Sequence, residues 1–418
     1  MCQRKCLIGR ATLVLLLSRV KDKKQRVVLK LIWRDESRTD EGESLKLFKG
    51  YPGICQCKWS KVCLLSDLSN ATGLTSRDLR SQSAKLGILQ SQQTRLQLPV
   101  DRKPSTIMTD GEIGLSRIKR LPHLLEVLRD GLVEFAGMCL KHKLHRDISE
   151  GNILCTSLLN IGIGGAECWS ESEAILVDSD FDSMSNNLPP TSEAGEIEYV
   201  VISSNTKVDI RPLSAPTYEE YRKQRYNGEV KCIGKLYDLE FMVNQRRDDE
   251  KRRSPEKAGT PAFISAQLLL ATRHEPVQHT YLHDLESFFW VLVWIVATRV
   301  EPGKKMNAQA RELMAKLCNP DDQSLGDFKK GFITTPVASG KRIIKLNNGW
   351  KWAGGVVYEF AEFLNRSIYN IPVDDSDFLF LETLPETAVP MDEEDPWLDI
   401  KRAIDIFDRY ICLLQIQP

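Results

Sequence analysis

The segment KLHRDISEGNILC, residues 143–155, places an aspartate and an asparagine five residues apart, between an apolar helical run and an apolar strand-like one. The Asp147 carboxylate could accept a proton from an attacking hydroxyl, and the amide oxygen of Asn152 could bind a divalent cation. A helix before the loop and a strand after it would hold both groups rigidly. The pattern favours phosphoryl transfer, and its alternative is a chance occurrence of His-Arg-Asp.

Phosphoryl transfer also needs a lysine that contacts phosphate and a glutamate that orients it. Lys30, within VVLK, is the candidate lysine, although an edge-strand lysine that limits aggregation would look the same. The following helical segment supplies two candidate glutamates, Glu41 and Glu43. We favour Glu41 because Leu45 and Phe48 lie on its helical face, and Glu43 stays as the competitor.

A second metal-binding aspartate should follow a short apolar strand, and two residues qualify. Asp178 follows AILV, and Asp238 follows IGKLY. The later part of the pattern, GTPAF at residues 259–263, should come roughly twenty residues after this aspartate. Because Gly259 lies 21 residues beyond Asp238 and 81 beyond Asp178, we favour Asp238 and keep Asp178 as the alternative.

The elements that must position these residues can be predicted from periodicity. Residues 7–34 read as strands around a charged turn at 21–25, and residues 39–49 read as a helix. A short strand at 95–100 and a turn at 101–106 follow. Apolar spacing predicts an amphipathic helix at 121–140, a buried helix around 288–297 and a final helix at 395–414. Residues 156–230 are irregular and predict an insertion.

Composition excludes several classes of protein. The 418 residues carry 57 basic and 57 acidic side chains, so net charge gives no reason to expect nucleic acid or a membrane surface as a partner. The longest apolar run, 288–297, is about half of a membrane span. The 11 cysteines are scattered, which is typical of reduced thiols. These features predict an intracellular protein, cytoplasmic or nuclear.

In order along the chain, HRDISEGNIL, GKLYDLEF, KAGTPAFISAQLL and HTYLHDLESFFWVLVWI resemble the protein-kinase superfamily, and specifically the fungal-type protein kinases. The resemblance covers roughly residues 7–365. It implies an α+β, bilobal fold with a β-rich lobe at 1–98 and a mainly helical lobe at 99–418. It also implies ATP and Mg²⁺ as cofactors and a protein substrate phosphorylated on Ser or Thr.

Carried over by resemblance, Asp147 is the catalytic base, Asn152 and Asp238 are the metal ligands, and Lys30 with Glu41 forms the phosphate-orienting pair. His145 and Arg146 would be scaffold residues of the loop. Asp284 would brace the backbone of the loop, and Thr260 with Pro261 would face the substrate. The phosphate-covering loop would begin at Gly9.

Several residues depart from the family pattern. The glycine loop is reduced to Gly9 and its neighbours, which favours a pseudokinase scaffold as one alternative. Ser149 stands where serine/threonine kinases usually carry a phosphate-contacting lysine, which favours a small-molecule phosphotransferase as another. Gln267 occupies the place of a structural glutamate that would pair with a distant arginine.

Overall fold

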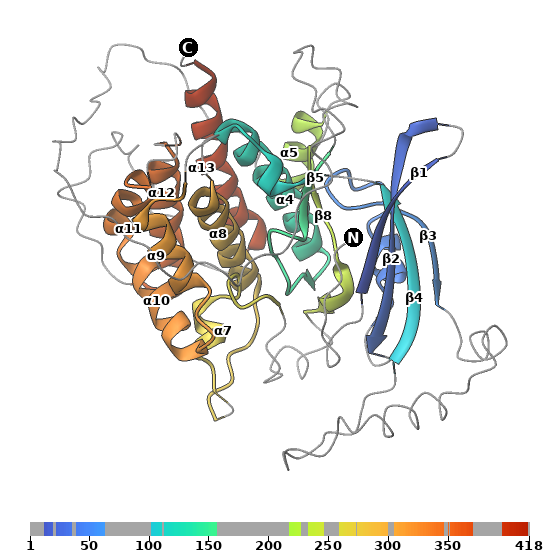
Figure 1. The fold of residues 1–418 in the computed structure, drawn as a ribbon, viewed down its shortest axis with the longest axis horizontal. Coiled ribbons are helices and arrows are strands. Elements are labelled where there is room, and N and C mark those ends of the chain that lie inside the picture. The colour runs from blue at the N-terminus through green and yellow to red at the C-terminus, as the bar shows by residue number, and fades with distance from the viewer. Residues whose placement is uncertain are drawn as a thin grey trace. The chain divides into compact units, whose positions relative to one another are not determined.

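The computed structural model describes residues 12–19, 22–35, 39–62, 102–110, 113–156, 217–226, 233–245, 259–272, 274–299, 305–346, 350, 352–370 and 395–416. Near the N-terminus, four strands form one sheet in the order β1-β2-β4-β3, and every neighbouring pair is antiparallel (Figure 1). Its strands are β1 (Thr12–Arg19), β2 (Asp22–Asp35), β3 (Cys57–Val62) and β4 (Arg102–Asp110).

Strands β1 and β2 form the predicted pair, but the turn between them is tighter than expected. Arg19 pairs with Asp22, and the register then shifts so that Ser18 pairs with Arg26. Most of the predicted turn at 21–25 is therefore strand with a bulge, a feature that local charge does not distinguish from a loop.

Strand β4 corrects the turn predicted at 101–106. Pro104 pairs with Trp33 of β2, whereas pairing with β3 begins only at Ser105. Proline is tolerated there because the strand has one described neighbour at that point. Since β4 completes the sheet, a lobe boundary after residue 110 keeps the sheet whole, and the predicted boundary at residue 98 stays a prediction.

Helix α1 (Glu41–Lys46) carries the candidate glutamates. The side chain of Asp40 caps it by accepting the Glu43 amide at 3.3 Å. Residues 47–50 are a turn, so the helix is shorter than the 39–49 predicted. Gly50 adopts φ +83, which turns the chain out of helical geometry.

The remainder of the described chain is mainly helical, as predicted. Helix α8 has its whole central part buried, and its rings pack edge-on against neighbouring helices, for example Phe289 against Phe360. The described helices after the sheet are α4 (Leu121–Leu140), α5 (Tyr218–Arg225), α7 (Ala266–Leu270), α8 (Tyr281–Thr298), α9 (Ala308–Leu317), α10 (Asp322–Thr334), α11 (Pro336–Ile344), α12 (Ala353–Leu364) and α13 (Pro396–Ile416). Three single turns join them: η1 (Leu115–Arg117), η4 (Leu239–Phe241) and the π-helical η5 (Asn365–Tyr369).

Two small sheets formed by strands before and after α4 position the candidate site. One has the order β5-β7-β8, with β5 (Ile113–Gly114), β7 (Ile153–Cys155) and β8 (Gly234–Leu236). The other pairs β6 (Lys143–Leu144) with β9 (Val243–Asn244). Together they fix the two ends of the HRD loop, which is the segment from His145 to Asn152, and place β8 beside its second end.

Helices α5 and α13 both pack against α4. Helix α5 lies within the stretch predicted as irregular, and a capping box between Thr217 and Glu220 starts it. Helix α13 is the predicted final helix. Among the described residues, no helix combines the length and apolar character that crossing a membrane requires.

Candidate functional site

The loop that carries Asp147 is held by a buried carboxylate from α8. Asp284 is 1% exposed and accepts the backbone amides of His145 at 2.8 Å and of Arg146 at 3.1 Å. Arg146 has φ +67, a left-handed backbone conformation that residues other than glycine rarely adopt. The two amide bonds stabilise this turn, because they fix the orientation of consecutive peptide units. The brace implied for Asp284 is therefore present as a contact.

His145 links this loop to the segment before Asp238. The amide of Asp147 donates to His145 Nδ1 at 3.3 Å, so Nε2 carries the proton and donates to the Tyr237 carbonyl at 2.9 Å. Asn152 closes the loop from its other end, because its Nδ2 donates to the Asp147 carbonyl at 2.8 Å. That bond leaves the amide oxygen of Asn152 as the atom suited to a cation.

Lys30 makes two short ion pairs with carboxylates. Its Nζ lies 2.8 Å from Glu41 Oε2 and 2.8 Å from Asp238 Oδ1. The other candidate, Glu43, is exposed and pairs with Lys46 at 2.5 Å. Strand β2, helix α1 and the turn after β8 thus bring one residue each to a common point.

Burial and charge act in opposite directions on this cluster. Burial alone would lower the pKa of Lys30, but Glu41 and Asp238 raise it above its ordinary value. Burial raises the pKa of Glu41 to about 7, with Lys30 opposing the shift and Asp238 and Glu240 adding to it. One lysine thus faces an excess of negative charge, a setting that fits a divalent cation.

Asn152 and Asp238 are neighbours through the backbone. The Tyr237 amide donates to the Asn152 carbonyl at 2.8 Å, and Ile153 pairs with Leu236 where β7 meets β8. Asp238 has φ +59, so the chain turns sharply at the residue that would hold the metal. One carboxylate and one amide oxygen suit Mg²⁺, which completes its shell with water and phosphate. The alternative ligand Asp178 and the glycine-loop residue Gly9 lie outside the described residues.

The segment GTPAF lies against the HRD loop. Gly259 has φ +110, and a Cβ atom there would lie 3.2 Å from the Arg146 carbonyl and 3.3 Å from Asp147 Oδ1. A hollow beside Asp147 is lined by Arg146, Thr260, Ser265, Leu268 and His279, among others. GTPAF therefore lies beside the carboxylate of Asp147.

The two departures Ser149 and Gln267 lie at hydrogen-bonded positions, Ser149 through its backbone and Gln267 through its side chain. Ser149 is buried, and its carbonyl accepts the amides of Asn152 at 3.0 Å and Ile153 at 3.2 Å. Gln267 accepts a hydrogen bond from His283 Nε2 at 3.0 Å. A serine buried in the turn of the loop supplies no positive charge to a phosphate.

Two buried charged residues hold the end of GTPAF and the start of α7. Glu286 accepts Ser265 Oγ at 2.7 Å and the Ala266 amide at 2.8 Å. Lys329, from α10, donates to the carbonyls of Pro261 at 3.1 Å and Ile264 at 2.6 Å. Burial lowers the pKa of Lys329 to about 7, and Glu286 opposes the shift.

Sequence reasoning missed Asp130, His279 and Lys329. His279 Nε2 lies 2.8 Å from Asp284 Oδ1, and Asp130 binds the start of β8. Each has the local pattern of an ordinary helix or loop residue. The partners of Asp130 and Lys329 come from distant parts of the chain, so no spacing rule would have found these two residues. His279 contacts Asp284 five residues later, but its sequence context carries no motif that marks the contact.

Comparison with known proteins identifies the family. A family model described as fungal protein kinase matches residues 1–296, more than two thirds of the chain. The match contains Lys30, Glu41, Asp147, Asn152 and Asp238. A search of curated proteins finds no match. With a strand-rich N-terminal part, a helical C-terminal part and this match, the chain belongs to the fungal protein kinase family, a family of kinase-like phosphotransferases.

Proposed function

We propose that this protein is an ATP- and Mg²⁺-dependent kinase that phosphorylates Ser or Thr hydroxyls of proteins. The observation that carries the proposal is the position of Lys30 Nζ, 2.8 Å from both Glu41 and Asp238. A lysine held between a helix glutamate and a candidate metal ligand is poised to contact the phosphates of a nucleotide. The fold alone would support a scaffold equally well.

Each residue has a defined task in the transfer. The acceptor oxygen attacks the γ-phosphorus, the bond from that phosphorus to the bridging oxygen of ADP breaks, and Asp147 accepts the hydroxyl proton. Lys30 orients the phosphates, and Glu41 orients Lys30. Asn152 and Asp238 would hold Mg²⁺, which neutralises charge on the phosphates when bound. Asp284 keeps the loop of Asp147 in the turn that this requires.

A direct test compares the wild type with Asp147→Asn in radiolabel transfer from ATP to a library of Ser- and Thr-containing peptides. We expect loss of transfer by about 10²-fold or more, with unchanged binding of MgATP in a thermal-shift titration. A variant at an exposed carboxylate, Glu312→Gln, is the matched control. Equal transfer by Asp147→Asn and wild type would overturn the proposal.

Two alternative functions are each favoured by a specific feature of the chain. Ser149, buried where a lysine is usual, favours a small-molecule phosphotransferase, which would label small alcohols or aminoglycosides but no peptide. The reduced glycine loop at Gly9 favours a pseudokinase, which would show no thermal shift with ATP and Mg²⁺ or a shift without transfer. The thermal-shift titration, together with the transfer assay run on peptides and on small alcohols and aminoglycosides, therefore separates all three functions.

A further inference from the structure

Strand β8, which leads directly to Asp238, is attached to helix α4 by one buried carboxylate. Asp130 is fully buried, and its Oδ2 accepts the backbone amides of Ile233 at 2.7 Å and Gly234 at 3.4 Å. These are the first amides of the segment that ends four residues later at Asp238. The carboxylate thus fixes where β8 begins on the surface of α4.

The same strand approaches the backbone of α4 very closely. A Cβ atom at Gly234 would lie 2.0 Å from the carbonyl oxygen of Val127, so only glycine fits there without displacement. The fit at Gly234 and the hydrogen bonds of Asp130 are independent observations. Both show that β8 packs closely against α4. A shift of β8 would therefore move Asp238.

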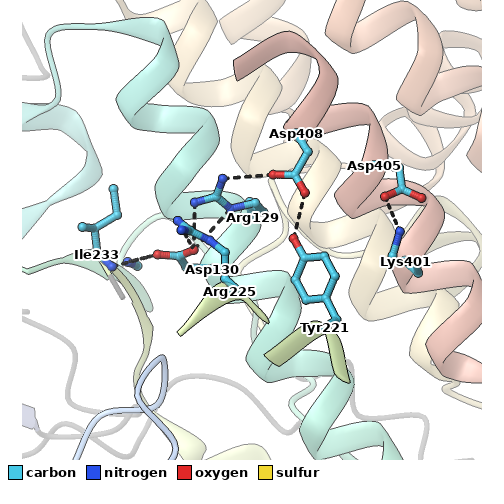
Figure 2. A network of polar contacts seen from close by, with 9 residues as sticks. Arg129, Asp130, Tyr221, Arg225, Ile233, Lys401, Asp405 and Asp408 are labelled. Atoms are coloured by element: carbon cyan, nitrogen blue, oxygen red, sulfur yellow. Dashed lines mark hydrogen bonds and ion pairs between the residues drawn. The ribbon is translucent and has the colours of Figure 1, made fainter. Parts of the chain in front are cut away.

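Charged side chains from three helices, α4, α5 and α13, surround Asp130 and balance one another (Figure 2). Arg129 of α4 lies 3.2 Å from Asp130 Oδ1, and Arg225 of α5 lies 3.5 Å from the same oxygen. Arg129 also pairs with Asp408 of α13 at 3.0 Å, and Tyr221 of α5 donates to Asp408 at 2.8 Å. The four charges sum to zero.

This balance affects how strongly Asp130 can hold β8. Two arginines face two aspartates, so Asp408 shares Arg129 with Asp130 and restrains its guanidinium. Burial raises the pKa of Asp130, and Arg129 opposes the shift most strongly among its partners. A loss of Asp408 or Arg225 would leave a buried charge uncompensated, which displaces its neighbours. Helix α13 lies beyond residue 296, outside the family match, and α5 lies in the predicted insertion.

We propose that Asp130 is a positioning residue for Asp238, and that α5 and α13 are positioning elements that act through Arg225 and Asp408. The inference rests on the proposed function for its effect on catalysis, but not for its effect on β8. Binding of MgATP then depends on α13, which lies beyond residue 296, where the family match ends. Asp130 acts through the backbone of β8 and touches no substrate.

The test uses the full chain and the variant Asp408→Asn, with Asp405→Asn as the matched control. Asp405 lies one turn away on the same helix and pairs locally with Lys401 at 2.5 Å (Figure 2). Hydrogen exchange of the peptide covering residues 233–238 is measured without nucleotide, relative to a peptide within α8. We expect faster exchange at 233–238 in Asp408→Asn and no change in Asp405→Asn.

The second readout is steady-state kinetics. We expect Asp408→Asn to raise the KM for MgATP by about tenfold, as when a hydrogen bond to a charged group is weakened, with the KM for peptide unchanged. The variant Asp130→Asn should give a larger change in both readouts. Equal exchange at 233–238 in the two α13 variants, or faster exchange spread uniformly over the chain, would overturn the inference.

A different result would contradict the proposed function. If Asp238→Asn transfers phosphate as well as the wild type, Asp238 has no role in the reaction, and the function is wrong. The exchange readout can still support the anchoring of β8 in that case. If Asp238→Asn is inactive while exchange at 233–238 is insensitive to Asp408, the function stands and the inference falls.

Discussion

Two buried aspartates hold the two functional segments in the same way, yet their surroundings differ. Asp284 of α8 accepts two consecutive amides of the HRD loop, and Asp130 of α4 accepts two consecutive amides at the start of β8. Asp284 is partnered by His279, five residues before it. Asp130 is partnered by arginines from α4 and α5 and, through one of them, by α13.

The difference in partners has an electrostatic consequence. Although burial acts to raise it, the pKa of Asp284 is lowered by His279 and by the amides it accepts, so its charged form is favoured. The pKa of Asp130 is raised by burial despite its arginines. The anchor of the Asp147 loop is therefore partnered by a residue close in sequence, whereas the anchor of β8, which precedes Asp238, is partnered through arginines by α5 and α13.

The largest effect that can sharpen this contrast is expected at Asp284. Asp284→Asn offers one acceptor oxygen to two amides, so the turn at Arg146 should relax and displace Asp147. We expect kcat to fall by about 10²-fold with little change in the KM for MgATP. Steady-state kinetics of both variants test this difference, because Asp130→Asn should change the KM for MgATP more than it changes kcat. Reversed patterns would show that the two anchors do not act separately.

A glycine makes a close backbone approach at each anchored segment: Gly234 of β8 approaches α4, and Gly259 of GTPAF approaches the HRD loop. Alanine substitutions compare the two. Gly234→Ala should cost about 3 kcal/mol because its Cβ would overlap the Val127 carbonyl. Gly259→Ala should cost about 1–2 kcal/mol because its φ of +110 disfavours a side chain. Urea unfolding measures both.

Gly331 is the control for these substitutions. It lies in α10, and no atom comes within 4 Å of a Cβ built there. Gly331→Ala should leave stability unchanged or raise it by about 0.5–1 kcal/mol. A smaller loss of stability for Gly234→Ala than for Gly259→Ala would mean that β8 packs less tightly against α4 than Gly259 packs against the HRD loop.

A pH dependence is expected for a third anchor, the buried residues Lys329 and Glu286 at the end of GTPAF. Burial lowers the pKa of Lys329 to about 7 from an ordinary value of 10.5. Between these values the unfolded chain binds the proton and the folded protein does not, so this group makes stability rise with pH, by at most about 1.4 kcal/mol per unit. Glu286, whose pKa burial raises, contributes the opposite slope at lower pH.

The measurement compares Lys329→Met with Lys330→Met, its exposed neighbour in α10. The free energy of unfolding of Lys329→Met should lack the rise between pH 7 and 10 that wild type and Lys330→Met share. Identical slopes for all three would mean that Lys329 titrates in the fold as it does in water.

The smallest effect concerns the start of α5, which carries Arg225 and Tyr221. Thr217→Ala removes the capping box and should destabilise this helix by about 1 kcal/mol. Faster hydrogen exchange in α5 should be accompanied by a slight increase at 233–238. Thr335→Ala is the control, because Thr335 stands at the N-cap of α11 without a capping hydrogen bond. No change in β8 would limit the role of α5 to its own stability.

Much of the site was predictable where partners are close in sequence or fixed by a motif. The HRD loop with Asn152, the strand with Lys30, the preference for Glu41 and the helices at 121–140 and 395–414 follow from spacing and periodicity. The turn at 101–106 was wrong because local proline content outweighed the pairing of β4 with β2, a contact between distant segments. Helix α5 was missed within an irregular stretch.

The sequence by itself determined which groups can do chemistry, because side-chain type and local spacing carry that information. It also determined the main helices, since their apolar periodicity is local. Only the tertiary structure decided that Asp130 and Asp284 hold the backbone of β8 and of the HRD loop, and that Glu286 and Lys329 bind the backbone after GTPAF. Those contacts join residues from 20 to more than 130 positions apart, and folding alone brings them within hydrogen-bonding distance.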